Sequence, residues 1–132
     1  MIVIDASAVV DVVAHRKLDA LPDRLARDDT LHAPHLLDVE VTHALRGLVA
    51  RGELSVRDAS NARMDAVEMS ITLYPHALLL ERAWQLRDTL SAHDAVYVAL
   101  AELLPAPLVT CDAGLAASTS HDAAIELYAP DG

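Results

Sequence analysis

Short apolar runs alternate with amphipathic segments along the chain. Ile2-Val3-Ile4 is a β-branched run that ends at Asp5, which predicts a buried strand. Similar runs predict four more strands, at 30–33, 71–74, 107–112 and 124–128. Helical spacing or caps predict helices at 7–14, 18–28, 36–51, 55–69, 76–90 and 91–104, and a short one from Ala113. Strands that alternate with helices predict an α/β fold of three layers, α/β/α, around a central parallel sheet of about five strands.

Two of the predicted helices carry the clearest patterns. Leu37, Val41, Ala44 and Leu48 follow i, i+4, i+7 and i+11, which predicts an amphipathic helix. The segment from Ser91 to Leu104 has no charge after its first turn except Glu102, so we expect a helix buried on most sides. Ser91 is the expected cap of that helix, and Asp94 is its third residue.

Length and composition favour one soluble domain over residues 1–132. Hydrophobic residues make up 53% of the chain, which argues against disorder. The single cysteine, Cys111, excludes an internal disulfide framework and suits a reducing compartment. No apolar run reaches the roughly 18–20 residues of a membrane span, and Met1 is followed by no basic leader. We therefore expect a cytoplasmic protein with no membrane partner.

The charge balance is strongly acidic. Twenty Asp and Glu face ten Lys and Arg, so the formal net charge is −10. This balance argues against broad nucleic-acid binding, which needs clustered basic residues. Four arginines nevertheless cluster in the two middle predicted helices, namely Arg46, Arg51, Arg57 and Arg63. They could guide RNA or form surface ion pairs, and both alternatives stay open.

Four acidic residues are expected at one edge of the sheet. Asp5 and Asp112 each end a predicted strand, while Asp94 and Glu40 lie near the starts of helices. In a parallel α/β sheet the helix N-termini lie at the carboxyl ends of the strands, where such folds place their sites. The topology therefore brings Asp5, Glu40, Asp94 and Asp112 together.

Each of these acids has a simpler interpretation when taken alone. Asp94 could cap its helix, Asp5 or Asp112 could form a turn, and Glu40 could be solvated or paired. Taken together, four carboxylates without a nearby Lys or Arg would repel one another, and a divalent cation removes that repulsion. All-oxygen ligands suit Mg²⁺ or Mn²⁺ rather than Zn²⁺.

Three segments resemble a known family: MIVIDASAVV, LDVEVTHAL and LSAHDAVYVALAELLPAPLVTCDAGL. They are similar to the PIN domain and, more closely, to VapC-type toxins of bacterial toxin–antitoxin pairs, from Met1 to about Leu127. The resemblance implies a PIN-like fold and an endoribonuclease that depends on Mg²⁺, with Mn²⁺ as an alternative. It implies that Asp5 and Asp94 are the primary metal ligands and that Glu40 and Asp112 complete the cluster, directly or through water.

The resemblance carries further expectations. The reaction would be hydrolysis of RNA phosphodiesters that leaves 5′-phosphate and 3′-hydroxyl ends. Ser7 and Thr110 would orient a ligand or a water, although local hydrogen bonding is an equal alternative. The partners would be a VapB-type antitoxin and a second copy of the chain, with residues 36–70 and Trp84 as candidate interface. The chain departs from the family pattern after Asp112, where an alanine, a glycine, a leucine and an alanine follow, so a second metal ion stays an open question.

Other functions fit the residues less well. Glu40-x-x-His43 has the spacing of half a di-iron motif, but the sequence holds no second copy. Phosphotransfer folds also place an Asp after the first strand, yet they need a Lys near the phosphate, and Lys17 is the only one. Dehalogenase-like phosphatases want an Asp where Ser7 stands. A PIN nuclease outside any toxin pair and a non-catalytic acidic binding domain remain as alternatives.

Overall fold

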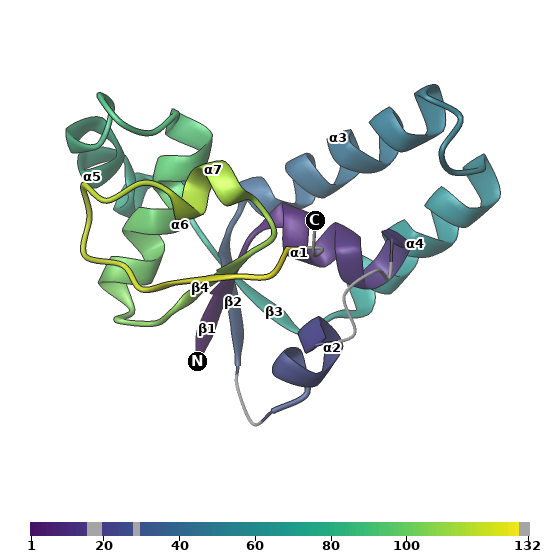
Figure 1. Ribbon diagram of the computed structural model, residues 1–132, viewed down its shortest axis with the longest axis horizontal. Helices are drawn as coiled ribbons and strands as arrows, with labels where there is room; N and C mark the ends of the chain where they lie inside the picture. Colours follow the sequence, from purple (N-terminus) through teal and green to yellow (C-terminus); the bar gives the residue numbers. More distant parts are fainter. Residues whose placement is uncertain (16–19, 28–29, 130–132) are drawn as a thin grey trace.

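A five-stranded parallel sheet forms the centre of the protein (Figure 1). The structure is a computed structural model that describes residues 1–15, 20–27 and 30–129. The strand order is β3-β2-β1-β4-β5, and every neighbouring pair is parallel. The strands are β1 (Ile2–Ile4), β2 (Leu31–Pro34), β3 (Ile71–Tyr74), β4 (Leu108–Thr110) and β5 (Ile125–Leu127). The predicted parallel α/β fold is therefore confirmed.

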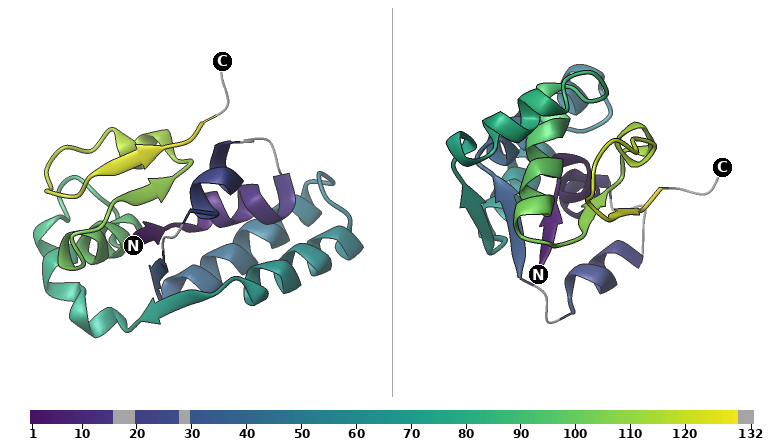
Figure 2. Two further views of the ribbon diagram at one scale, coloured as in Figure 1. Left: turned by 90° about the horizontal axis from the view of Figure 1, so that it is seen from below. Right: turned by 90° about the vertical axis from the view of Figure 1, so that its left-hand side faces the viewer.

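Helices cover the sheet in two groups, seen on either side of the strands in Figures 1 and 2. One group is built around α6, which packs against β1, β2 and α5; in the other, α3 packs against both α1 and α4. Among the described residues, no helix is long and apolar enough to cross a membrane. The helices are α1 (Ala6–Val10), α2 (Ala20–Leu25), α3 (Leu36–Ala50), α4 (Val56–Glu68), α5 (Leu80–Gln85), α6 (Ala92–Leu103) and α7 (Ala113–Ala116).

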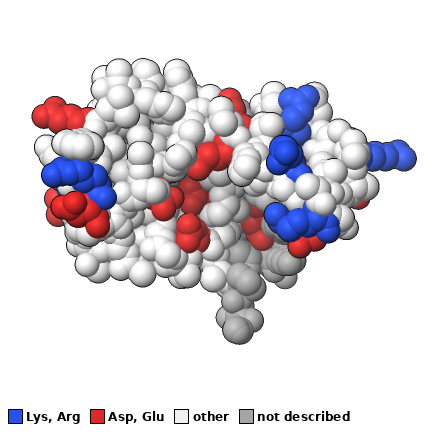
Figure 3. Space-filling view, turned by 90° about the horizontal axis from the view of Figure 1, so that it is seen from above, with Lys and Arg blue, Asp and Glu red and all other residues white. Residues whose placement is uncertain are grey.

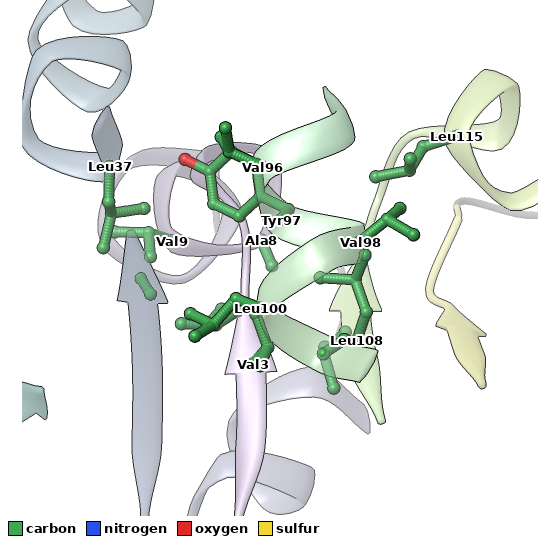
Figure 4. Packing of buried hydrophobic residues seen from close by; sticks show 14 of the residues in the cluster. Val3, Ala8, Val9, Leu37, Val96, Tyr97, Val98, Leu100, Leu108 and Leu115 are labelled. Atoms are coloured by element: carbon green, nitrogen blue, oxygen red, sulfur yellow. The ribbon is translucent and has the colours of Figure 1, made fainter. Parts of the chain in front are cut away.

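The core lies between β1 and α6. The three residues of β1 are fully buried, and the residues of α6 from Ala95 to Ala101 are at most 4% exposed. Figure 4 shows Tyr97, Leu100 and Val3 among the packed side chains. The near absence of charge in this helix is therefore explained by its burial, as its sequence predicts.

Two predicted helices have different boundaries in the structure. The helix predicted over 7–14 is split, because α1 ends at Val10 and a wider π-helical turn follows over Asp11–His15. The helix predicted over 76–90 is also broken, into a 3₁₀ turn at His76–Leu78 and the short α5. Its apolar stripe still faces inward, since Leu79, Ala83 and Leu86 are buried.

Smaller differences concern the predicted strand at 30–33 and the helix at 18–28. The strand extends through Pro34, which lacks an N–H group but still pairs with Tyr74. The helix is present as α2 over residues 20–25. The remainder of its predicted range, together with Lys17, lies partly outside the described residues.

An ion pair fastens α2 to the edge strand β5. The Arg24 side chain is buried, and its Nε and Nη2 donate to the two carboxylate oxygens of Glu126 over 2.9 and 3.2 Å. The Arg24 guanidinium holds the pKa of Glu126 below its ordinary value. Paired hydrogen bonds of this kind are stronger than neutral ones and fix direction as well as distance.

We expect Arg24→Met to lower the free energy of unfolding by about 2 kcal/mol, because it leaves Glu126 without its charged donor. Urea denaturation at pH 7 measures the change. Arg57→Met in α4 is the matched control, since Arg57 is exposed and its loss is expected to change stability by less than about 0.5 kcal/mol. Equal effects of the two substitutions would show that the pair contributes nothing.

Candidate active site

Asp5 is the innermost acid of the candidate site. It follows β1 directly, caps the N-terminus of α1 and is only 6% exposed. Its Oδ1 accepts hydrogen bonds from the Ser7 hydroxyl over 2.7 Å and from the Ala8 N–H over 3.0 Å. Its Oδ2 accepts one from the Thr110 hydroxyl over 2.5 Å. Both carboxylate oxygens are therefore held in place by the chain.

The hydroxyls of Ser7 and Thr110 join the ends of β1 and β4. The backbone N–H of Cys111 donates a hydrogen bond to the Ser7 Oγ over 2.9 Å. The N–H of Asp112 donates one to the Thr110 Oγ1 over 3.0 Å. Each hydroxyl thus donates to Asp5 and accepts from the segment that follows β4. The predicted closeness of these two residues to the strand ends is confirmed, and their observed task is to position Asp5.

Asp112 stands on the exposed side of the site, directly after β4. Its Oδ1 accepts hydrogen bonds from the N–H of Gly114 over 2.8 Å and from the N–H of Leu115 over 3.4 Å. Asp112 therefore caps the N-terminus of the short helix α7. Asp112 thus does bind the backbone of the turn that follows β4, which is the simpler interpretation of this residue taken alone.

Asp94 and Glu40 complete the acidic edge from two helices. The N–H of Asp94 donates to the Ser91 Oγ over 3.2 Å, so Ser91 is the cap of α6, as predicted, and Asp94 is not. Glu40 lies one turn into α3 and is half-buried. The Tyr97 hydroxyl donates to its Oε1 over 2.6 Å, which fastens α3 to α6 across the site.

Tyr97 was not predicted as part of the site. Its side chain is 2% exposed, and its ring packs within the hydrophobic core while its hydroxyl points towards the start of α3 (Figure 4). The only signal in the sequence is that a hydroxyl stands three residues after Asp94 in an otherwise apolar helix, which places both on one face. A buried tyrosine needs a partner for its hydroxyl, and Glu40 supplies it.

Electrostatic interactions connect the four acids through Asp112 and Tyr97. Burial raises the pKa of Asp5, and the charge of Asp112 raises it further. Burial and the same Asp112 charge also raise the pKa of Asp94. The pKa of Tyr97 is raised by burial, by its bond to Glu40, and by the charges of Glu40, Asp5 and Asp94. The charge of Asp112 thus opposes those of Asp5 and Asp94, and the charges of Glu40, Asp5 and Asp94 all act on the Tyr97 hydroxyl.

The donor set fits a hard divalent cation such as Mg²⁺ or Mn²⁺. Every candidate ligand is a carboxylate oxygen, and Figure 3 shows acidic side chains gathered around a hollow between the two helical groups. Within the described ranges, no three His, Cys, Asp or Glu side chains are grouped so that they could hold a metal ion together. Mg²⁺ usually keeps several waters and binds through only one or two carboxylates.

Other residues considered from the sequence lie outside this cluster. Burial is the main cause that raises the pKa of Cys111 to about 12, so it stays a thiol and not a nucleophile. Trp84 is 69% exposed, which excludes it from the core, and Arg87 lies 4.6 Å from its ring centre. Arg51 forms an exposed ion pair with Glu53 over 3.4 Å, whereas His93 is exposed beside Asp94.

The family model of the PIN domain matches residues 2–118 of this chain. The chain belongs to the PIN domain family. Ribonuclease VapC1 of Mycobacterium tuberculosis is 44% identical over 128 residues, which cover 95% of this PIN domain and 96% of the relative. Ribonuclease VapC12 of the same organism is 41% identical over 129 residues, covering 98% and 100% of the two chains. The crystal structure of PAE2754 from Pyrobaculum aerophilum superposes with a TM-score of 0.68 at 26% identity, covering 93% of this chain and 81% of that one.

The raised pKa of Asp94 predicts how stability depends on pH in the metal-free protein. At pH 7 the charged Asp94 destabilises the folded state, and the penalty disappears as the pH falls through the raised pKa. Asp94→Asn is therefore expected to be more stable than the unchanged protein at pH 7 with a chelator present. Its advantage should shrink as the pH falls towards 4, measured by urea denaturation. If the gain in free energy of unfolding of Asp94→Asn stays constant or grows as the pH falls, the raised pKa of Asp94 is contradicted.

We expect Tyr97→Phe to lower the free energy of unfolding by about 1–2 kcal/mol, because it removes the donor to the Glu40 carboxylate. Denaturation in urea measures this loss. Tyr128→Phe is the matched control, since its hydroxyl makes only a 3.4 Å contact with Glu126. If both substitutions change stability equally, the link between α3 and α6 has no energetic role.

Proposed function

We propose that this PIN domain is a metal-dependent endoribonuclease of the VapC type. The observation that carries the proposal is the convergence of Asp5, Glu40, Asp94 and Asp112 at one edge of the sheet. No Lys or Arg of the described residues is among the groups that shift the pKa of Asp5 or Asp94. Relatives named ribonucleases, 41–44% identical over nearly the whole chain, support the same activity.

Each residue has a defined task in this proposal. Asp5 and Asp94 would be the primary ligands of the cation, and Glu40 and Asp112 would complete its shell directly or through water. Mg²⁺ or Mn²⁺, when bound, supplies the charge that polarises a phosphate oxygen and makes a water acidic enough to attack. Ser7 and Thr110 hold the Asp5 carboxylate, and Tyr97 holds Glu40. Cleavage would leave 5′-phosphate and 3′-hydroxyl ends on the RNA.

A toxin role and an antitoxin partner are the second part of the proposal. A cavity of about 250 Å³ lies between α3 and α4, and Leu45, Val49 and Val56 make up much of its wall. Arg46 and Arg63 stand in the same wall, and Figure 3 shows basic side chains gathered over this helical pair. An apolar groove flanked by arginines suits an amphipathic helix that carries acidic residues. We propose that a small antitoxin docks there, and that the toxin forms homodimers.

Two alternatives are separated from this proposal by simple observations. A PIN nuclease outside any toxin pair would be harmless when expressed alone in several hosts. A toxin would arrest growth, and an adjacently encoded protein would relieve the arrest. A non-catalytic acidic domain would bind no divalent cation and would leave total RNA uncut.

Purified, antitoxin-free protein is expected to cut single-stranded RNA with Mg²⁺ or Mn²⁺ and to stop when a chelator is added. Asp94→Asn should slow cleavage by at least about 100-fold, because it removes a ligand of the ion that stabilises the transition state. Mapping of cleavage ends on total RNA measures the activity. Asp88→Asn, an equal charge change at an exposed position, should cut at the unchanged rate. If the unchanged protein cuts no RNA with Mg²⁺ and none with Mn²⁺, the proposed function is overturned.

A further inference from the structure

A second cavity adjoins the acidic cluster on the side of α1 and α3. Its volume is about 480 Å³, within the range of roughly 300–1,000 Å³ that small-molecule sites occupy. Glu40 of the acidic cluster and Ser7, whose hydroxyl donates to Asp5, also form part of its wall. The rest of the wall consists of the small or apolar side chains Ala6, Val10, Ala44 and Cys111, together with His43 and Asp11.

Asp11 is the unusual member of this wall. It opens the π-helical turn after α1, and its side chain is only 7% exposed. Its Oδ2 is buried and, among the described residues, finds no hydrogen-bond donor, and a buried acceptor without a donor costs free energy of folding. The negative charge of Asp11 also contributes to the raised pKa of Cys111, which places the carboxylate close to that thiol. The proposed chemistry of the acidic cluster makes no use of Asp11.

The missing partner of Asp11 must be a donor, because an ionised carboxylate only accepts hydrogen bonds. The terminal torsion of an aspartate is broad, so either of its oxygens can turn towards the cavity. A flat ligand with two adjacent N–H groups would satisfy both oxygens at once. The apolar walls formed by Ala6, Val10 and Ala44 suit the faces of such a ring.

Among the RNA bases, only guanine offers two adjacent donors on its Watson–Crick edge, N1–H and the N2 amino group. Cytosine and adenine present a single amino group there, and the N3–H of uracil is flanked by two carbonyl oxygens that a carboxylate would repel. Single-stranded RNA presents these edges unpaired. We propose that this cavity is a guanine-binding subsite next to the acidic cluster, with Asp11 as the residue that selects the base.

This inference rests on the proposed ribonuclease function, and it adds to that function a preference for sites with a guanine beside the cut. A metal ion is a weaker candidate for the cavity. Asp11 and Glu40 are the only carboxylates among the described residues that line it, and Glu40 already accepts the Tyr97 hydroxyl. A guanidinium group from a basic protein would present similar donors, so the experiment includes it as a competitor.

The cleavage test compares short single-stranded RNAs that differ only in the base beside one cut. The unchanged protein is expected to cut the guanine RNA at least about tenfold faster than the adenine, cytosine or uracil RNA. Asp11→Asn should reduce that ratio at least tenfold, since an amide presents a donor where guanine needs an acceptor. Asp88→Asn, with an equal charge change at an exposed position, should keep the ratio. A preference for guanine that persists in Asp11→Asn overturns the inference.

A binding test separates this inference from the proposed function, because it needs no cleavage. Nuclear magnetic resonance titrations measure the affinity of guanosine, inosine, adenosine, cytidine, uridine and methylguanidinium. Guanosine should bind about tenfold more tightly than inosine, which lacks the 2-amino group, and it should shift the signals of Ala6, Val10 and Ala44. Asp11→Asn should abolish that difference.

Three results would overturn the guanine subsite: equal affinity for guanosine and inosine, tighter binding of methylguanidinium, or signal changes confined to other surfaces. Guanosine binding in a protein that cuts no RNA would refute the ribonuclease proposal and leave the subsite supported. Thermal unfolding is the folding control, and Asp11→Asn should melt no lower than the unchanged protein, since it removes a buried charge without a partner. A clearly lower melting temperature would show a structural role and would also contradict the inference.

Discussion

The buried carboxylate of Asp5 is the interaction on which the rest of the site depends. A charged oxygen pair in the interior is tolerated only when donors surround it, and here two hydroxyls and one backbone N–H do so. The same hydroxyls of Ser7 and Thr110 accept the N–H groups that follow β4, so they fix the end of that strand against β1. Satisfying one buried charge therefore also sets the direction in which Asp112 leaves the sheet. On the other side, Tyr97 connects α6 to Glu40.

This arrangement concentrates negative charge at a cost in stability. Burial raises the pKa of both Asp5 and Asp94, and the charge of Asp112 raises it further, so Asp112 opposes each of them in the metal-free protein. A divalent cation would turn that repulsion into attraction, and the charged cluster would then favour phosphate. The four acids also account for part of the overall charge. Without them, 16 acids face 10 bases, or −6 in place of −10. The remaining acidity argues for RNA contact over a limited face, or for a partner whose basic residues meet the acidic surface outside the groove that Arg46 and Arg63 flank.

Much of the fold could be predicted from the sequence, because the strands and α6 are short or strongly apolar segments with clear ends. The strand-to-helix order then placed four acids at one edge without any knowledge of tertiary contacts. Tyr97 escaped prediction because a tyrosine in an apolar helix has the pattern of a core residue, and only the structure shows where its hydroxyl points. Asp11 escaped because a regular helix was expected over 7–14, whereas the π-helical turn shifts every residue after Val10. The break after His76–Leu78 was hidden for a similar reason, since the apolar stripe continues across it.

The central claim is that four carboxylates from separate elements of this PIN domain form one cation site. A crystal structure of the protein grown with Mn²⁺, with anomalous diffraction measured to locate the ion, tests that claim most directly. We predict an anomalous peak at the carboxyl edge of the sheet, from an ion bound by Asp5 and Asp94, with Glu40 and Asp112 bound to it directly or through waters. Saturating Mn²⁺ that produces no peak at this edge, or a peak only elsewhere on the surface, would contradict it.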